Sequence, residues 1–538
     1  MGVRMKRAGV IFVGILLAAS FASAIPQGWI EQRVSRGDPG LWDNSFNTQL
    51  FRDSAGARHI VWAYLRQGAH FDIRHATITD NSAQITEITP NRPGAQHDPQ
   101  VAVLPNYFFI AWTDNELSNG RNSQIVMQRV NNQGITQGLQ RVISNNNVQV
   151  ANAQEPSIAV DNNNIRIVWA DNRNGNYDIY YSKHDQFGDP ISGLGNIRLT
   201  TNSGDSLMPS VTVNQDNTFN VVWADNQDGI RRLYFARLSD SGTRVINDIR
   251  LPTYGDNPEG VMNLNSVLGN DGSLFIVWEE LTSTLPLPFG TAGVFVQRIN
   301  PVNGQIITQF LQISTGIFGN TVTAPTLVPD NMGNIYAAFS EGRFNSGMGH
   351  PLYLQKYDIS TNELRSIFNL QLTNDYAISD FSSLLFDGQE VHIAFVNTRN
   401  DVDGEVFYAR SAAEVVWQDI RENEQGAMVL RNTLWSRSYV QAALALGDTP
   451  GFDLTDGRHI PLNPDPLFWL TITNTPMPMF PSTMSGRLNG EGKLRLPVIP
   501  PEGSRDARIY GAFVVYEPNQ PQPAGIKFIS KAFPVAVG

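Results

Sequence analysis

The chain has 538 residues, with 50 acidic and 39 basic side chains and a formal net charge of −11 at pH 7. An acidic protein is poorly suited to neutralising phosphates, so this balance argues against a nucleic-acid partner. The sequence contains no Cys, which excludes disulfides and thiol nucleophiles and leaves core packing to stabilise the fold. Its length is ample for more than one hydrophobic core.

Residues 1–24 have the pattern of a secretory signal. Three basic residues precede an apolar stretch from Ala8 to Phe21, and Ala22–Ala24 supplies the small residues of a cleavage site. The apolar stretch is too short to span a bilayer comfortably, and we predict no membrane span. We therefore expect an exported protein, extracellular, at the cell surface or periplasmic. Its mature chain has 36 basic and 50 acidic residues, a net charge of 36 − 50 = −14.

Residues 25–410 contain seven copies of one unit. In its clearest copy, residues 161–183, two alternating apolar runs are separated by a turn with Asn and Gly, which predicts an antiparallel hairpin. The aromatic residue near the end of the first run recurs as Trp62, Trp112, Trp169, Trp223, Trp278, Phe339 and Phe395. The spacing of 50 to 61 residues lies near the upper end of the range for solenoids and propellers. We expect these aromatic rings to pack between neighbouring sheets.

Each copy also has a strand before the hairpin and another after it. The leading strand often contains proline, as in Pro99–Val103 and Pro156–Val160, and Gln140–Ser144 is an example of the trailing strand. Four antiparallel strands make a propeller blade, and four to eight blades close a ring. The sequence thus predicts an all-β fold containing a seven-bladed β-propeller.

The last blade needs a strand from elsewhere in the chain. The seventh copy has a third strand at Val406–Arg410 with no clear fourth strand after it, whereas Ile30–Ser35 resembles Gln140–Ser144. We predict that this N-terminal strand completes the last blade and closes the ring. Without it, two unpaired strand edges would face each other.

The sequence after the repeats has a different character. Residues 411–437 break the repeat, and we assign them as a linker, with a partial strand layer or a short helix as alternatives. Residues 438–538 contain short predicted strands joined by Pro- and Gly-rich connections. This pattern is typical of a small β-sandwich, here expected to be Ig-like.

The repeat carries a family resemblance. The pattern apolar-Trp-x-Asp-x-Arg-x-Gly-x-x-Asp-Ile-Tyr at Val168–Tyr180 resembles repeats of exported bacterial propellers of the sialidase-like group, also called BNR-like. Residues 456–467 resemble a β-sandwich tail found on secreted bacterial proteins. The resemblance implies the fold and life outside the cytoplasm. The arginine triad and tyrosine–glutamate pair of sialidases have no counterparts here, so it implies no catalytic residues.

Metal and nucleophile motifs are sparse. The eight His are scattered singly, without zinc-ligand spacing, and no Gly-x-Ser-x-Gly elbow is present. Asp401 and Asp403 cluster at a turn and are weak calcium candidates. Because Asp also caps tight turns through the backbone, we favour turn capping and predict no cofactor.

Charged residues recur at the hairpin turn of each copy, and folding would gather them around one rim. Loops on a rigid scaffold commonly carry function, so this rim is the predicted ligand site. Its candidate residues are Asp114, Asp171, Arg173, Asp225, Glu279, Glu280, Glu341, Arg343 and Arg399.

With no recognisable catalytic spacing, the sequence favours a binding protein over an enzyme. We expect a secreted or cell-surface adhesion protein whose partner is a glycan or an envelope or extracellular protein. The alternative is a carbohydrate-active enzyme, either a glycoside hydrolase or a lyase, with carboxylates on the rim or in the central channel. A passive structural component of an envelope is a third possibility, distinguished by self-assembly in solution.

Overall fold

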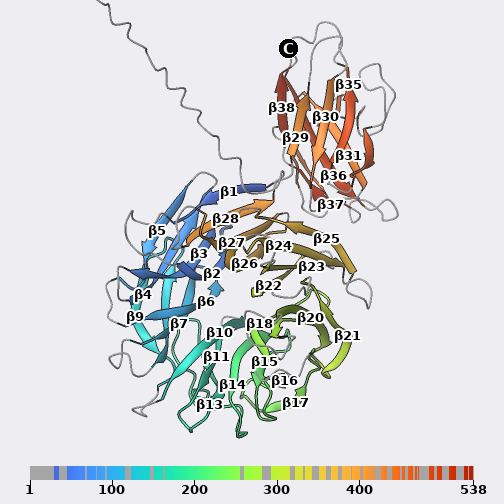
Figure 1. Ribbon diagram of the computed structural model, residues 1–538. Coiled ribbons are helices and arrows are strands. Elements are labelled where there is room, and N and C mark those ends of the chain that lie inside the picture. Colours follow the sequence, from blue (N-terminus) through green and yellow to red (C-terminus); the bar gives the residue numbers. More distant parts are fainter. Residues whose placement is uncertain are drawn as a thin grey trace, which may run out of the picture.

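A computed structural model shows an all-β protein (Figure 1). It describes most of residues 29–536, and the expected signal segment lies outside the described residues. Short gaps interrupt the described chain, and the longer undescribed stretches are residues 1–28, 36–44, 116–122, 146–150, 255–259, 282–291, 315–321, 342–349, 359–364, 374–378, 400–403, 419–425, 433–438, 455–458, 472–483, 500–507 and 517–525. Within the described part, no helix is long and apolar enough to cross a membrane.

Seven four-stranded antiparallel sheets are formed by the described residues up to Ser411. Sheet 1 contains β2 (Ser45–Arg52), β3 (Arg58–Arg66), β4 (His70–Ile78) and β5 (Ala83–Glu87), and sheet 2 contains β6 (Gln96–Leu104), β7 (Tyr107–Asp114), β8 (Gln124–Asn131) and β9 (Thr136–Val142). Sheet 3 contains β10 (Ala153–Asp161), β11 (Asn164–Asp171), β12 (Asp178–His184) and β13 (Ile197–Arg198), and sheet 4 contains β14 (Ser206–Val213), β15 (Phe219–Asp225), β16 (Arg232–Leu238) and β17 (Arg244–Arg250). Sheet 5 contains β18 (Val261–Leu268), β19 (Leu274–Leu281), β20 (Ala292–Asn300) and β21 (Gln305–Gln312), and sheet 6 contains β22 (Val322–Pro329), β23 (Asn334–Glu341), β24 (Leu352–Asp358) and β25 (Arg365–Gln371). Sheet 7 contains β26 (Ser379–Phe386), β27 (Val391–Asn397), β28 (Glu405–Ser411) and the N-terminal strand β1 (Trp29–Arg33).

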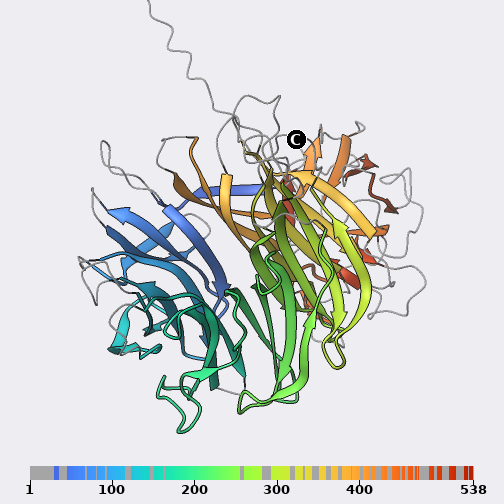
Figure 2. The same ribbon diagram turned by 60° about the horizontal axis from the view of Figure 1, so that its bottom comes forward.

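The sheets form a closed ring, an arrangement consistent with a propeller. The first strand of each sheet contacts the first strand of the next, from β2 through β6, β10, β14, β18 and β22 to β26, and β26 contacts β2. These inner strands lie toward the centre in Figure 1, and Figure 2 shows the sheets side by side from another direction. The ring therefore surrounds a central channel lined by seven inner strands.

The N-terminal strand closes the ring, as the sequence predicted. β1 pairs antiparallel with β28, with Ile30 opposite Arg410 and Arg33 opposite Phe407. A bidentate ion pair adds to the backbone bonds, because both terminal nitrogens of Arg399 lie 2.8 Å from the carboxylate oxygens of Glu31. Sheet 7 thus joins the start of the described chain to residues almost 400 positions later.

The recurring aromatic residues pack between sheets, which confirms that prediction. All seven are at most 2% exposed. Trp223, for example, shares a cluster with Val168 and Tyr181 of the preceding sheet. In sheets 3 to 7 the ring also stacks on the aromatic residue directly opposite it in the third strand, with centroids 5.7 to 5.9 Å apart. Such cross-strand pairs add to the free energy gained from burial.

Two further sheets follow the ring. One contains β29 (Glu414–Gln418), β30 (Gly426–Arg431) and β35 (Lys493–Val498). The other contains β34 (Ser485–Arg487), β31 (Tyr439–Ala445), β36 (Arg508–Tyr516), β37 (Ile526–Ile529) and β38 (Phe533–Ala536), and a hairpin joins β32 (Phe452–Asp453) to β33 (His459–Ile460).

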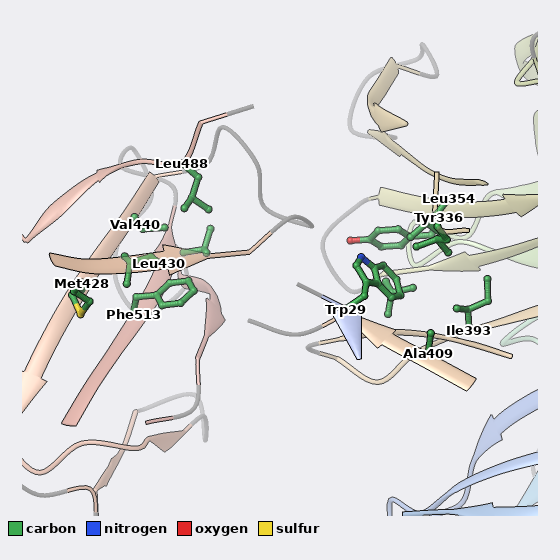
Figure 3. Close-up of a cluster of buried hydrophobic side chains, with 14 of the residues drawn as sticks. Trp29, Tyr336, Leu354, Ile393, Ala409, Met428, Leu430, Val440, Leu488 and Phe513 are labelled. Carbon is green, nitrogen blue, oxygen red and sulfur yellow. The ribbon is translucent and has the colours of Figure 1, made fainter. Parts of the chain in front are cut away.

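The assignment of residues 411–437 as a linker needs correction. They contain β29 and β30, and β30 pairs with β35 along its whole length. Apolar side chains of the two C-terminal sheets share a hydrophobic cluster, as Figure 3 shows for Leu430, Val440 and Phe513. The segment is therefore a strand layer of the C-terminal sheets. The same cluster also includes Trp29, Tyr336 and Ile393, which lie on the ring side of the view.

Two histidines that are far apart in the sequence meet inside sheet 1. Both His59 and His75 are fully buried, and His59 Nδ1 lies 3.0 Å from His75 Nε2. His59 Nε2 also lies 3.3 Å from Asp53 Oδ2, and His75 Nδ1 lies 2.9 Å from Thr86 Oγ1. Burial, with the neighbouring His59, lowers the pKa of His75 to about 3, and burial lowers the pKa of His59 as well.

This pair predicts acid sensitivity of the fold. At a pH between the unfolded-state pKa of about 6.5 and the folded-state pKa, His75 binds a proton in the unfolded chain but not in the folded chain. Stability from His75 is therefore present above pH 6.5 and is lost as the pH falls toward about 3. Urea unfolding between pH 7.5 and 4 should give a weaker pH dependence for His75→Gln than for the wild type. Equal slopes for the two proteins would contradict this origin.

Ring closure makes a second prediction. The variant Glu31→Ala leaves the Arg399 guanidinium without its bidentate partner, and a hydrogen-bonded charge contributes about 1.5–3 kcal/mol. Asp248→Ala is the control, because its ion pair with Arg244 lies at the surface and such pairs contribute about 0–1 kcal/mol. Urea unfolding should show a clear loss of stability only for Glu31→Ala. Equal losses of unfolding free energy in the two variants would mean that the Glu31–Arg399 pair stabilises the fold no more than a surface ion pair does.

Candidate functional site

Every inner strand carries a β-bulge at the same place. The pairing between first and second strand shifts by one residue, between Phe46 and Gln49 in sheet 1 and at matching positions in the other six sheets. Eight non-glycine residues in the described part of the chain have positive φ, and five of them are the extra residues of these bulges: Asn47, Asp98, Glu155, Met208 and Asn263. A bulge re-aims a side chain, and left-handed backbone at a non-glycine residue is costly. The strained positions therefore gather around the channel.

These bulges line a cavity in the centre of the ring. Its volume is about 490 Å³, within the range of about 300–1,000 Å³ for ligand pockets. All five positive-φ bulge residues line it, together with small polar side chains such as Ser157, Ser210 and Thr326. The cavity is therefore polar and large enough for several sugar rings or a similarly sized ligand.

Asp98 is held in place by its neighbours. The Asn47 side-chain amide donates to Asp98 Oδ1, and His97 Nδ1 lies 2.8 Å from Asp98 Oδ2. The Asp98 side chain nevertheless remains 31% exposed. It is thus a positioned carboxylate that a ligand in the channel can reach.

Glu155, from the adjacent sheet, has a different environment. Its Oε2 accepts a 2.7 Å hydrogen bond from the Met208 backbone amide. Gln154 Nε2 makes a longer contact of 3.4 Å with Oε1. Burial raises the pKa of Glu155, and the charge of Asp98 raises it further against the opposing effects of the Met208 amide and Arg231. Glu155 therefore retains its proton to a higher pH than an ordinary glutamate.

The pKa of His97 is influenced by both Asp98 and Glu155. Burial by itself lowers the pKa of His97, but its hydrogen bond to Asp98 and the charges of Asp98, Asp114 and Glu155 outweigh that effect and raise the pKa. Two carboxyl groups with different environments and a histidine thus interact at one side of the channel. A carboxyl group with a raised pKa beside a hydrogen-bonded, partly exposed one is an arrangement typical of acid–base pairs.

Most of the predicted rim carboxylates have partners inside the sheets. Asp114, Asp171, Asp225 and Glu280 are at most 1% exposed. Each accepts the indole N–H of the recurring tryptophan two residues earlier, at 2.9 to 3.3 Å. Their side chains therefore anchor the tryptophans between the sheets. Ligand contact by these residues stays a prediction.

The remaining rim candidates differ in their surroundings. Arg173 contacts the Asp171 carboxylate at 2.6 Å and lies over the Tyr180 ring, and Arg399 is paired with Glu31 as described above. Glu279 accepts a 2.6 Å hydrogen bond from Asn263, so it supports a channel residue, and Glu341 is buried. Arg343 and the calcium candidates Asp401 and Asp403 lie outside the described residues.

One group of side chains in the described chain has ligand atoms close enough to hold a metal. Asp387, Glu390 and His392 place these atoms within 4.8 Å of one another. His392 Nε2 lies 2.8 Å from Asp387, and Glu390 is paired with Arg410 at 2.9 Å. The same turn position in sheet 1 holds the Asp53–His59 pair. The repetition indicates a structural contact between a histidine and a carboxylate at the turn.

The sequence interpretation missed Asp98 and Glu155, although a signal was present. Each directly precedes the proline of a leading strand, Pro99 or Pro156, so both occupy one repeat position. An acidic residue at matching positions of two successive copies was the visible sign. Its orientation into the channel depends on the bulge, which the sequence pattern does not reveal.

Comparison with known proteins adds little at the sequence level. No protein-family model matches the chain, and no curated protein matches it. Among solved structures, an ulvan lyase is 12% identical, with 68% of this chain and 94% of that chain aligned and a TM-score of 0.43. An α-L-arabinofuranosidase from Fusarium graminearum is 10% identical, with 71% and 96% aligned and a TM-score of 0.40. A protein of unknown function from Dyadobacter fermentans is 9% identical, with 72% and 99% aligned and a TM-score of 0.41.

These comparisons correct one expectation. The sequence favoured a non-enzyme, and this expectation is contradicted, because most of the similar structures named in the comparison are glycoside hydrolases and polysaccharide lyases. The similarity concerns the fold and provides no residue-by-residue correspondence.

The anchoring role of the rim carboxylates is testable. Asp225→Ala leaves the buried indole N–H of Trp223 without its acceptor, and an unsatisfied buried donor costs about 1–3 kcal/mol. We expect a loss of at least about 2 kcal/mol in urea unfolding, because Asn202 and Ser206 also lose their acceptor. Asp228→Ala, at the exposed turn that follows, is the control. An unchanged unfolding midpoint for Asp225→Ala would argue against anchoring.

Proposed function

We propose that the protein is a carbohydrate-active enzyme that hydrolyses glycosidic bonds in the channel of a seven-bladed β-propeller. The observation that carries this proposal is the pair Asp98 and Glu155, which neighbouring bulges turn into one polar cavity. Glycoside hydrolysis needs two carboxyl groups, one protonated and one ionised. The raised pKa of Glu155 and the two hydrogen bonds to Asp98 support that division.

In this proposal Glu155 is the general acid. Because its Oε2 accepts the Met208 amide, the proton is placed on Oε1, from which it can pass to the leaving glycosidic oxygen. Asp98 then acts on the opposite side of the scissile bond, either by accepting a proton from the attacking water or by attacking the anomeric carbon itself. In either case the net reaction adds one water across the carbon–oxygen bond.

Asn47, His97 and Asn263 position the reacting groups and the sugar. Asn47 and His97 orient Asp98 from two sides. Asn263 gives its N–H to Glu279, which leaves its amide oxygen to accept sugar hydroxyls. Met208 lies between Glu155 and Asn263 in the order of the sheets and offers an apolar contact. Such a mixture of polar and apolar groups is suited to a neutral or weakly charged glycan.

The proposal includes the setting of the enzyme. We infer that residues 1–24 direct export, that the substrate is an extracellular glycan, and that the C-terminal sheets form an Ig-like β-sandwich beside the propeller. The acidic composition and the polar channel are consistent with this setting.

Substitution of the two carboxylates tests the reaction. A panel of neutral and acidic polysaccharides is incubated with the protein, and release of reducing ends is measured. Glu155→Gln and Asp98→Asn should each reduce the rate by about 10²–10⁴-fold, the usual contribution of acid–base catalysis. Asp216→Asn, at an exposed turn far from the bulges, should retain full activity. Activity that survives both channel substitutions would refute the assignment, and an unsaturated ultraviolet-absorbing product would indicate elimination in place of hydrolysis.

The pH profile offers an independent check. Activity should fall on the alkaline side as Glu155 loses its proton, at a pH above the usual carboxyl range because burial and Asp98 raise its pKa. In Asp98→Asn the neighbouring negative charge is gone, so the alkaline limb of the residual activity should move to lower pH. If the alkaline limb does not move, Glu155 is not the group whose titration produces it.

A further inference from the structure

The third strands of the ring carry a recurring basic residue. It is Arg129, Lys183, Arg237, Arg298, Lys356 and Arg410 in sheets 2 to 7. Five of the six form an ion pair with a carboxylate at a turn. Lys183 pairs with Asp240 at 2.6 Å, Arg237 with Asp216 at 2.5 Å, Arg298 with Asp271, Lys356 with Asp330 at 3.8 Å, and Arg410 with Glu390 at 2.9 Å.

Arg129 differs from the other five. Its contact is with the Tyr107 ring, whose centroid lies 5.2 Å from the guanidinium carbon, and no ion pair joins it to a carboxylate within the described part of the chain. Its own sheet has Pro105–Asn106 at the turn where sheets 4 to 7 carry the acidic partner. Among the described residues of its sheet, no carboxylate is therefore paired with it.

In the described part of the neighbouring sheet, Asp185 and Asp189 lie on the facing turn, but neither forms an ion pair with Arg129. Tyr181 donates to the backbone oxygen of Asp240 at 3.1 Å, and Tyr107 donates in the same way to Gln186 at 2.6 Å. The turns after the third strands of sheets 3 and 4 therefore correspond. Gln186 occupies the position of Asp240, which is the carboxylate partner of Lys183. The next position changes as well, because Phe187 replaces the serine at 241. Gln186 thus replaces a carboxylate and Phe187 adds an exposed aromatic ring, while Asp185 and Asp189 stand where the matching turn has Ser239 and Thr243.

These changes surround a groove on the outer part of sheets 2 and 3. It has a volume of about 130 Å³ and is lined by Arg129, Arg141, Gln137, Leu139 and Phe187, among others. Phe187 is 53% exposed. Arg141 pairs with Asp189 at 2.6 Å, but both side chains remain more than a third exposed, so water weakens the pair and a ligand can compete for Arg141.

We propose that this groove binds the carboxylate of a uronate residue in an acidic saccharide. Arg129 would hold the carboxylate through its forked N–H groups, with Arg141 and Gln137 beside it, and the sugar ring would lie against Phe187. At about 30 Å³ per water, the groove has room for about four waters, which suits one sugar residue and not a chain.

The groove is separate from the catalytic channel. Arg129 lies opposite Phe109 near the start of β7, whereas the bulge of sheet 2 lies near Thr113 at the other end of that strand. Binding in this groove is therefore independent of hydrolysis at Asp98 and Glu155.

Calorimetric titration of the full-length protein tests this site. The probes are tri-galacturonate, the neutral trisaccharide maltotriose and inorganic sulfate. We expect saturable binding of tri-galacturonate only, weakened at least about tenfold in Arg129→Gln and less in Arg129→Lys, which keeps the charge but loses the fork. Phe187→Ala, a substitution at an exposed position, should also weaken binding without affecting folding.

Arg129→Gln has a matched control in Lys183→Gln, which changes the equivalent, already paired position of the next sheet. This control should leave the titration unchanged. Absence of saturable tri-galacturonate binding, equal binding of maltotriose, or full affinity in both Arg129→Gln and Phe187→Ala would overturn the proposal. Competition by sulfate at equal affinity would also overturn it, since the groove would then recognise a free anion and not a sugar acid.

Discussion

The structure depends on the pairing of β1 with β28, because the central channel exists only when the ring is closed. Sheets stacked in an open arc would leave an unpaired edge and expose the apolar face of a sheet. Closure joins residues separated by almost the whole ring, so its hydrogen bonds must offset a large loop-closure entropy. The Glu31–Arg399 pair strengthens this long-range contact.

The repeat determined what the sequence could predict. Alternating apolar positions and the recurring tryptophans identified the sheets, the buried rings and the closing strand, because each of these depends on a local pattern or on an obligatory partner. Residues 411–437 were assigned differently because β30 finds its partner β35 more than 60 residues later. Pairing at that distance leaves no local signature.

The site was predicted less well, for a related reason. The acidic residues at the ends of the second strands looked like surface groups, since a Trp-x-Asp pattern does not show which way the carboxylate turns. In the folded sheet both side chains of that pattern point to one side, and Asp114 and Asp171 accept the tryptophan N–H groups. Conversely, Asp98 and Glu155 looked like ordinary members of alternating strands until the bulges turned them into the channel.

The bulges also influence how such a protein can change. In five of the seven inner strands the extra residue presents a side chain to the channel, and the regular strand pairing resumes on either side of it. The described part of the ring therefore offers the same slot five times, each at a position with left-handed backbone. New specificities can arise on this scaffold by single substitutions in these slots to residues that accept that backbone conformation.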